Sequence, residues 1–118
     1  MSWSNYHQHC YYCDGTDKPE IYIISAMAKG IRSFGFSSHA PVPIGVEWCV
    51  KPEKFSAYLQ EIKSLQKKYA AILPIYIGME IDFIPDIIGP SDPQFEVLDY
   101  HIGSVHFAGQ FEDGTYWG

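Results

Sequence analysis

The chain has 118 residues, of which 47% are apolar and 19% are charged, and its formal net charge is −6. This balance indicates one folded domain, or part of one, and excludes a disordered chain. The acidic charge argues against nucleic acid as a partner, because a phosphate backbone attracts basic surfaces. The apolar stretches are too short to span a bilayer and we find no signal peptide, so we expect a cytoplasmic protein without membrane contact.

Short apolar runs alternate with segments of helical periodicity along the whole sequence. Asp17 and Pro19 indicate the start of a first helix, with Asp17 as its N-cap, and Gly30 indicates its end. Asp113 and Gly114 form a turn signal that predicts a hairpin. The predicted strands cover residues 3–8, 33–38, 75–83 and 101–107, and the predicted helices cover residues 19–29, 51–71 and 93–99.

This order of elements is typical of βαβ units, in which parallel strands lie side by side with helices packed over them. The predicted fold class is therefore α/β, with about four parallel strands and intervening helices. The clearest helix, residues 51–71, carries one apolar stripe that we expect to face the sheet. The stripe consists of Phe55, Leu59, Ile62, Leu65 and Tyr69.

Polar side chains gather where the predicted strands end. In parallel α/β folds the carboxyl ends of the strands meet at one edge of the sheet, and binding sites form there. Four of the five histidines and two carboxylates fall at this edge or in the loop after the first strand. These residues are His7, His9, Asp14, His39, Glu80 and His106.

This set of residues suits divalent metal ions. His7 and His9 alternate along an extended strand, so both imidazoles point to one side and can reach one ion. Glu80 is embedded in an apolar strand, where an unpaired carboxylate is costly and a bound cation removes that cost. Histidine and carboxylate ligands without thiolates suit Zn²⁺, Mn²⁺ or Fe²⁺. Asp82 shares a face with Glu80, but we assign it to a helix cap or a turn.

Six short motifs follow one another along the chain. They are His-Gln-His at 7–9, Asp-Gly at 14–15, Phe-Ser-Ser-His-Ala-Pro at 36–41, Gly-Met-Glu-Ile-Asp at 78–82, Asp-Tyr at 99–100 and Gly-Ser-Val-His at 103–106. Together they resemble the polymerase-and-histidinol-phosphatase (PHP) family, and most closely its histidinol-phosphate phosphatase branch. The resemblance spans nearly the whole chain, and the set is far more specific than His-X-His alone.

The resemblance implies a partial, distorted (β/α)₇ barrel that holds two or three divalent ions. It also implies a metal-dependent phosphatase that hydrolyses histidinol phosphate in histidine biosynthesis, with no catalytic side chain beyond the metal ligands. Bound divalent ions lower the pKa of water and neutralise charge on phosphoryl oxygens. Carried over by position, one ion takes His7 and His9, Glu80 bridges it to a second ion that His106 also binds, and a third ion takes Asp14 and His39.

The family pattern continues beyond these motifs, with a further His or Cys and a late Asp-X-His pair. This sequence ends at Gly118 after about four predicted strands. We therefore expect residues 1–118 to form a single, incomplete PHP domain, the N-terminal part of the barrel. An open half-barrel leaves a sheet edge and apolar faces unpaired, so we expect the isolated chain to be poorly stable, inactive, or self-associating through that edge. The sequence identifies no substrate-binding residues.

Other interpretations stay open. Cys10 and Cys13 could form a compact zinc site with His7 and His9, although four ligands within seven residues are crowded. The chain could carry another PHP activity, that of a phosphodiesterase or an exonuclease, against which its acidic charge argues. It could also be a half-barrel that binds metal without catalysis. For any single histidine, the alternative is a side chain that only completes hydrogen bonds.

Overall fold

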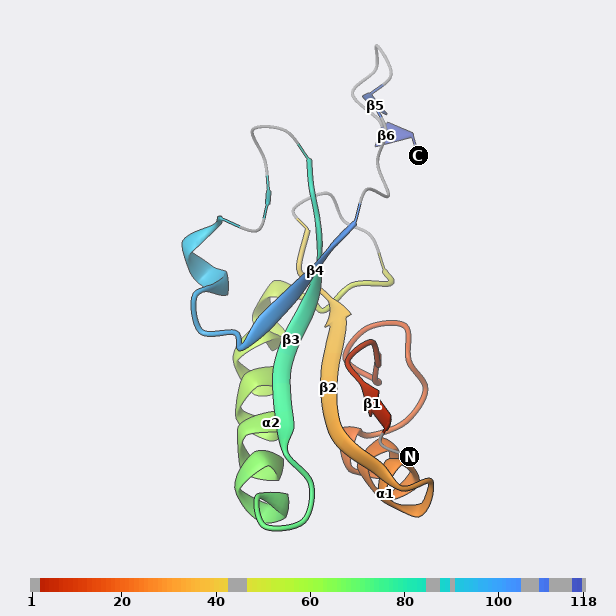
Figure 1. Ribbon diagram of the computed structural model, residues 1–118. Helices are drawn as coiled ribbons and strands as arrows, with labels where there is room; N and C mark the ends of the chain where they lie inside the picture. The colour runs from red at the N-terminus through yellow and green to blue at the C-terminus, as the bar shows by residue number, and fades with distance from the viewer. Residues whose placement is uncertain are drawn as a thin grey trace.

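Four parallel strands form the central sheet of the protein, in the order β1-β2-β3-β4, as the sequence predicts (Figure 1). The computed structural model describes residues 3–42, 47–84, 88–89, 91–104, 109–110 and 116–117. The strands are β1 (Trp3–Asn5), β2 (Ile31–His39), β3 (Ile75–Asp82) and β4 (Tyr100–Ser104), and the helices are α1 (Pro19–Ala28) and α2 (Phe55–Tyr69).

Three smaller features complete the described structure. Single 3₁₀ turns, Pro52–Lys54 and Pro93–Phe95, precede α2 and β4 respectively. The short strands β5 (Gly109–Gln110) and β6 (Tyr116–Trp117) pair antiparallel, as the predicted hairpin requires, while its turn at Asp113 and Gly114 lies outside the described residues. Among the described residues, no helix combines the length and the apolar character needed to cross a bilayer.

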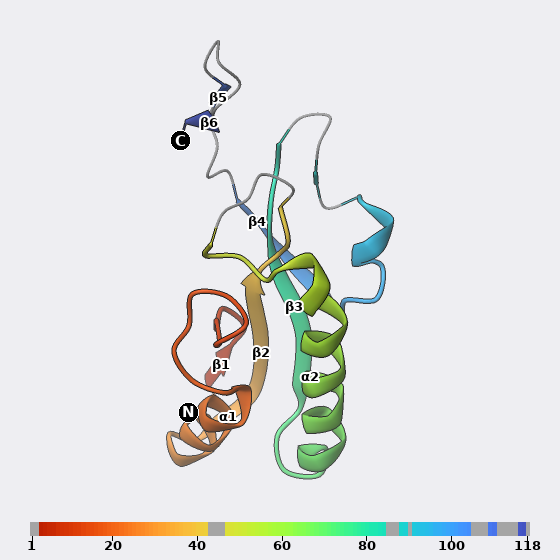
Figure 2. The ribbon, with the colours of Figure 1, turned by 180° about the vertical axis from the view of Figure 1, so that it is seen from behind.

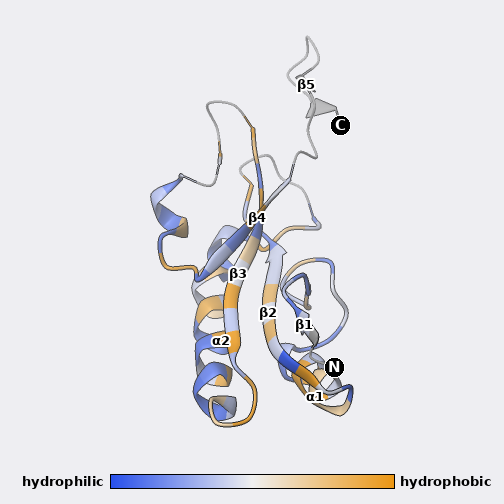
Figure 3. Ribbon diagram, viewed as in Figure 1, coloured by the Kyte–Doolittle hydropathy of each residue, from blue (hydrophilic) through white to orange (hydrophobic). Residues whose placement is uncertain are grey.

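Both helices cover the same face of the sheet. Figure 2, which views the molecule from behind, shows the helices in front of that face. Most of the alternate residues of β2 and β3 that point to that face are buried phenylalanine, isoleucine and methionine. Figure 3 shows the contrast between β3, which is hydrophobic along much of its length, and α2, which is hydrophilic over much of its surface. The core residues at this layer include Ile23, Phe34, Phe36, Ile62, Ile77 and Met79.

The opposite face of the sheet has a different composition, with aromatic residues packed over glycines. The ring of Tyr100 lies against Gly35 and Gly78, where a Cβ on either glycine would overlap it. The single proton of the Tyr100 hydroxyl is shared between the backbone oxygens of Tyr6, at 2.6 Å, and Phe36, at 3.0 Å. Tyr100 thereby ties β4 to β2 and to the segment that follows β1.

Several predicted boundaries are wrong in ways that local contacts explain. β1 ends at Asn5 rather than at residue 8, and the Asn5 side chain accepts a hydrogen bond from the backbone N–H of His7 at 2.9 Å, which turns the chain away from the strand. The N-cap of α1 is Lys18, not Asp17, and no side chain caps this helix. Gly30 does end α1, with a φ of 75° in the left-handed region that glycine tolerates.

The second helix is shorter than predicted, and its buried face is wider. The turn at Pro52 is 3₁₀ in form, so α2 begins at Phe55, and it ends at Tyr69, ahead of Pro74. Tyr58, absent from the predicted stripe, is fully buried and donates a hydrogen bond to the Gly78 carbonyl at 2.8 Å. The predicted helix over residues 93–99 is only a 3₁₀ turn.

We expect Gly78→Ala to destabilise the protein by about 1–3 kcal/mol, because the new methyl group would displace the Tyr100 ring from the sheet. The measurement is the urea unfolding midpoint. Gly103→Ala is the matched control, since a Cβ at Gly103 meets no atom within 4 Å. Equal midpoint shifts for the two variants would contradict this role of the glycine.

Candidate metal centre

The centre of the site is set by the register of two neighbouring strands. β2 and β3 pair so that His39 lies directly opposite Glu80, at the carboxyl end of each strand. Both side chains point to the face that the helices do not cover, and His39 Nδ1 lies 3.0 Å from Glu80 Oε2. Each residue is less than a tenth exposed. An imidazole and a carboxylate are therefore held in contact within the fold, with little water around them.

His7 and His9 approach this pair from the segment after β1. His7 Nε2 lies 2.7 Å from Glu80 Oε1, and His9 Nε2 lies 3.7 Å from the same oxygen. The sequence predicts that both imidazoles lie on one side of a continuous strand. That strand is not continuous, because β1 ends at Asn5, before either histidine. The segment nevertheless brings both rings to Glu80, whose side chain then faces three imidazoles.

A tight loop after His9 carries Asp14 back to the cluster. The backbone N–H of Gly15 donates to the Cys10 carbonyl at 3.0 Å, and a Cβ on Gly15 would lie 2.6 Å from the Cys10 backbone. Only glycine fits this close approach, so the Asp-Gly pair has a structural reason. The loop places Asp14 Oδ2 3.0 Å from His39 Nε2 and Asp14 Oδ1 3.2 Å from His9 Nδ1.

The site contains two overlapping groups of potential ligands, and within each group the ligand atoms lie within 4.8 Å of one another. One group is His7, His9 and Glu80, and the other is His9, Asp14 and His39. The structure thus brings together five of the six residues predicted from the sequence. The sixth, His106, lies outside the described residues.

Protonation in the site matches what metal ligands require. Burial lowers the pKa of the His39 imidazole, although the Asp14 and Glu80 carboxylates act in the opposite direction. Burial raises the pKa of the Asp14 carboxyl, but His39, Cys13 and His9 outweigh it and leave this pKa below its usual value. At neutral pH the imidazole is therefore neutral and the carboxylate ionised, which are the forms that coordinate metal.

The geometry around His39 provides a test of whether these residues fit a cation. Both ring nitrogens of His39 face carboxylate oxygens at 3.0 Å. A neutral imidazole has only one N–H, so the other nitrogen presents its lone pair to an anionic oxygen. A divalent cation held between such donors replaces this repulsion with two attractive contacts. The residues present fit a metal ion.

Three further side chains at this end of the sheet make contacts that the sequence did not predict. The Trp48 ring packs edge-on against His39, with 4.8 Å between ring centres, and helps to hold the imidazole plane. Asp82 lies within β3 and is almost fully buried, where it accepts a hydrogen bond from Ser104 at 2.6 Å, so the expected cap or turn role is wrong. Cys13 lies next to His9 and Asp14. Its position just before Asp14 was the available signal.

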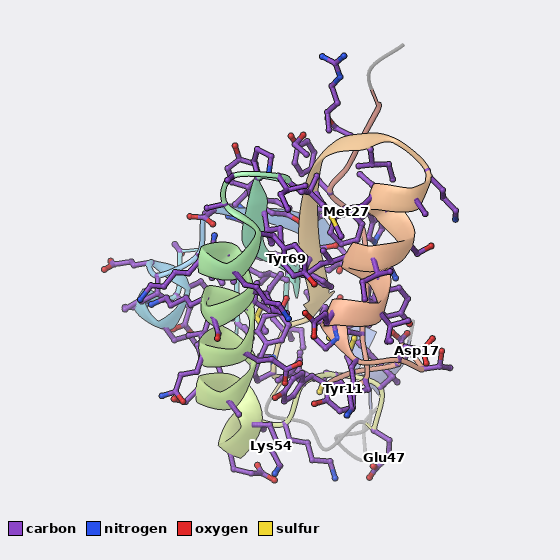
Figure 4. The ribbon with its side chains drawn as sticks, turned by 90° about the horizontal axis from the view of Figure 1, so that it is seen from below. Tyr11, Asp17, Met27, Glu47, Lys54 and Tyr69 are labelled. Atoms are coloured by element: carbon purple, nitrogen blue, oxygen red, sulfur yellow. The ribbon has the colours of Figure 1, made fainter. Side chains whose placement is uncertain are left out.

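The compact zinc site proposed for Cys10, Cys13, His7 and His9 is not assembled. The Cys10 side chain is fully buried and its sulfur lies 3.4 Å from the Ser38 hydroxyl, in the core. Cys13, by contrast, is half-buried and lines a cavity of about 500 Å³. Figure 4 shows Tyr11, Glu47 and Lys54, which line the same cavity, gathered at one end of the two helices.

Comparison with known protein families assigns the chain to one of them. A family model described as the PHP domain matches residues 5–118. The chain belongs to the PHP family.

Individual relatives from this family agree with that assignment. The chain is 32% identical over 113 residues to a candidate histidinol-phosphatase of Deinococcus radiodurans, and 30% identical over 114 residues to the histidinol-phosphatase of Bacillus subtilis. These matches cover 87% and 86% of this chain but 42% of each relative. The chain therefore spans about two fifths of the length of the curated relatives it matches.

A solved structure supports the fold. The chain superposes on a candidate histidinol phosphatase, hisK, from Listeria monocytogenes with a TM-score of 0.69, at 19% sequence identity. The match covers 98% of this chain and 48% of that protein. The four parallel strands and their helices are thus a PHP-type partial barrel, as the sequence predicts.

In the metal-free PHP chain we expect iodoacetamide to label Cys13 well before Cys10. Burial raises the pKa of the Cys10 thiol to about 11, so its thiolate fraction at pH 8 is about 100-fold lower than that of an ordinary thiol, and its sulfur is also inaccessible. Tandem mass spectrometry of timed samples measures both rates. Equal labelling rates in the folded chain would contradict the assigned positions of the two thiols.

Proposed function

We propose that this chain carries the metal site of a phosphomonoester hydrolase, with histidinol phosphate as its substrate. The observation that carries the proposal is the contact between buried His39 and Glu80, surrounded by His7, His9 and Asp14 at the carboxyl ends of parallel strands. Membership of the PHP family and likeness to histidinol-phosphatases support it. A role in histidine biosynthesis and a cytoplasmic location belong to the same proposal.

Each side chain has a defined role in this proposal. Glu80 presents Oε1 to His7 and His9 and Oε2 to His39, so its two oxygens suit a bridge between two bound ions. We propose His106 as the other ligand of the second ion, and Asp14 and His39 as ligands of a third. Two or three ions of Zn²⁺, Mn²⁺ or Fe²⁺, when bound, would activate water and offset phosphoryl charge. The chain needs no side-chain nucleophile in this scheme.

The net charge distinguishes among phosphorylated substrates. A charge of −6 is unsuited to a long polyanionic backbone, whereas local cations in the site can still attract one small phosphate ester. This favours a small monoester over a nucleic acid, and hence a phosphatase over a PHP exonuclease. A small phosphodiester and a purely metal-binding role remain the competing proposals, and turnover separates them.

The sheet edges bear on how the site is completed. In the described sheet β1 and β4 are the outer strands, each paired on one side. Tyr6 and Tyr76, on the face without helices, are each about two fifths exposed. Self-association through such an edge stays a prediction, as does the expectation that residues 1–118 form part of a larger barrel.

We expect a protein that carries residues 1–118 as part of a larger barrel to release phosphate from histidinol phosphate only when Zn²⁺ or Mn²⁺ is supplied, and to stop when a chelator is added. Glu80→Gln should lower the rate by about 100-fold, because it removes charge and one shared oxygen ligand from both ion positions. The measurement is colorimetric phosphate release, with bis(p-nitrophenyl) phosphate as the diester comparison.

Glu53→Gln is the matched control for that experiment. Glu53 is an exposed carboxylate on the 3₁₀ turn before α2, so its loss changes the net charge equally and should leave the rate unchanged. If the protein with the larger barrel binds metal but cleaves no monoester, the proposal is overturned in favour of a non-catalytic module. Preference for the diester would overturn it in favour of a phosphodiesterase.

A further inference from the structure

We propose that Cys13 is a thiolate ligand of the ion that His9 and Asp14 hold, so that this position is a mixed nitrogen, oxygen and sulfur site. The inference rests on the proposed metal centre and adds Cys13 as a donor, with partners that differ from those of the compact Cys10, Cys13, His7 and His9 site. It concerns the position formed by His9, Asp14 and His39.

Three donor atoms at this position are spaced like ligands of one ion. Cys13 Sγ lies 3.4 Å from His9 Nδ1 and 3.4 Å from Asp14 Oδ1, and these two atoms lie 3.2 Å apart. Tetrahedral coordination with metal–ligand bonds of about 2.0–2.3 Å separates neighbouring donors by about 3.3–3.6 Å. The sulfur, nitrogen and oxygen atoms therefore already form a face of nearly the required size.

The backbone of the loop sets this arrangement before any ion binds. The N–H groups of Cys13 and Gly15 both donate to the Cys10 carbonyl, at 3.1 and 3.0 Å. This double hydrogen bond folds residues 10–15 tightly, so the side chains of Cys13 and Asp14 both project beside His9. Cys10, three residues earlier, points into the core instead. The two cysteines thus have different roles despite their shared motif.

His9 has a second set of contacts that makes an additional donor useful. Its Nε2 lies 3.7 Å from Glu80 Oε1, on the side of His7, whereas its Nδ1 faces Asp14. An imidazole usually gives one nitrogen to one metal ion and uses the other for a hydrogen bond. When Nδ1 of His9 serves the ion beside Asp14, Cys13 Sγ is a further donor on the same side of that ring.

Cys13 is also accessible to an incoming ion. It is half-buried and lines the cavity of about 500 Å³ that Tyr11, Glu47 and Lys54 also line, and the last three are labelled in Figure 4. Binding would release the thiol proton to water and leave a thiolate on the ion. Because thiolate is a soft ligand, this position should prefer Zn²⁺ or Co²⁺ to Mn²⁺.

The test is a titration of the metal-free chain, residues 1–118, with Co²⁺ under reducing conditions, followed by absorption spectroscopy. We expect visible d–d bands, which report any ordered cobalt site, and a near-ultraviolet band from thiolate-to-cobalt charge transfer. Cys13→Ser should abolish the charge-transfer band and keep the d–d bands. It should also lower Zn²⁺ affinity by about tenfold or more, with a smaller change for Mn²⁺.

Cys49→Ser is the matched control, since Cys49 is a buried cysteine that lines the same cavity, and it should keep both sets of bands. If d–d bands form in the unaltered chain without charge transfer, the role of Cys13 is overturned while the metal centre stands. If the charge-transfer band survives in Cys13→Ser, another cysteine is the ligand and the inference is overturned. If neither band forms, the metal centre and the inference both fail.

Discussion

The contact between His39 and Glu80 is the constraint on which the rest of the site depends. Parallel pairing of β2 with β3 places the two residues opposite each other, and burial keeps them there with little water. Two ionisable groups in such a place are costly unless they are paired or bound to a cation. The remaining members, His7, His9 and Asp14, reach this pair from the segment that follows β1.

The two faces of the sheet carry different kinds of residues, and this keeps the ionisable pair apart from the apolar core. The face under α1 and α2 is apolar and supplies the core, while the opposite face carries the glycines and Tyr100 near the middle of the strands and the ionisable groups at their ends. Tyr100 holds β4, β2 and the segment after β1 together on that face. The positions of His7 and His9 thus depend indirectly on Gly35 and Gly78, which leave room for the ring.

Much of this arrangement could be predicted from the sequence, because strand order, helix order and the residues at strand ends follow from periodicity and from motifs. β3 and Glu80 are the clearest case, since an unpaired carboxylate in an apolar strand is costly and a cation at that point removes the cost. The route by which His7 and His9 reach the site could not be predicted, because it depends on the Asn5 hydrogen bond that ends β1. The division of Cys10 and Cys13 between core and site likewise depends on a loop whose shape periodicity does not encode.

The PHP family assignment and the buried His39–Glu80 contact lead to one central claim, that this strand end binds divalent metal. Anomalous diffraction from crystals of the chain grown with Zn²⁺ tests the claim most directly. We predict an anomalous peak at about 2.0–2.2 Å from His39 and from Glu80 or Asp14, with the ring nitrogens moved to face it. A zinc-soaked structure with no peak at this strand end, in which His39 and Glu80 stay in direct contact at 3.0 Å, would contradict it.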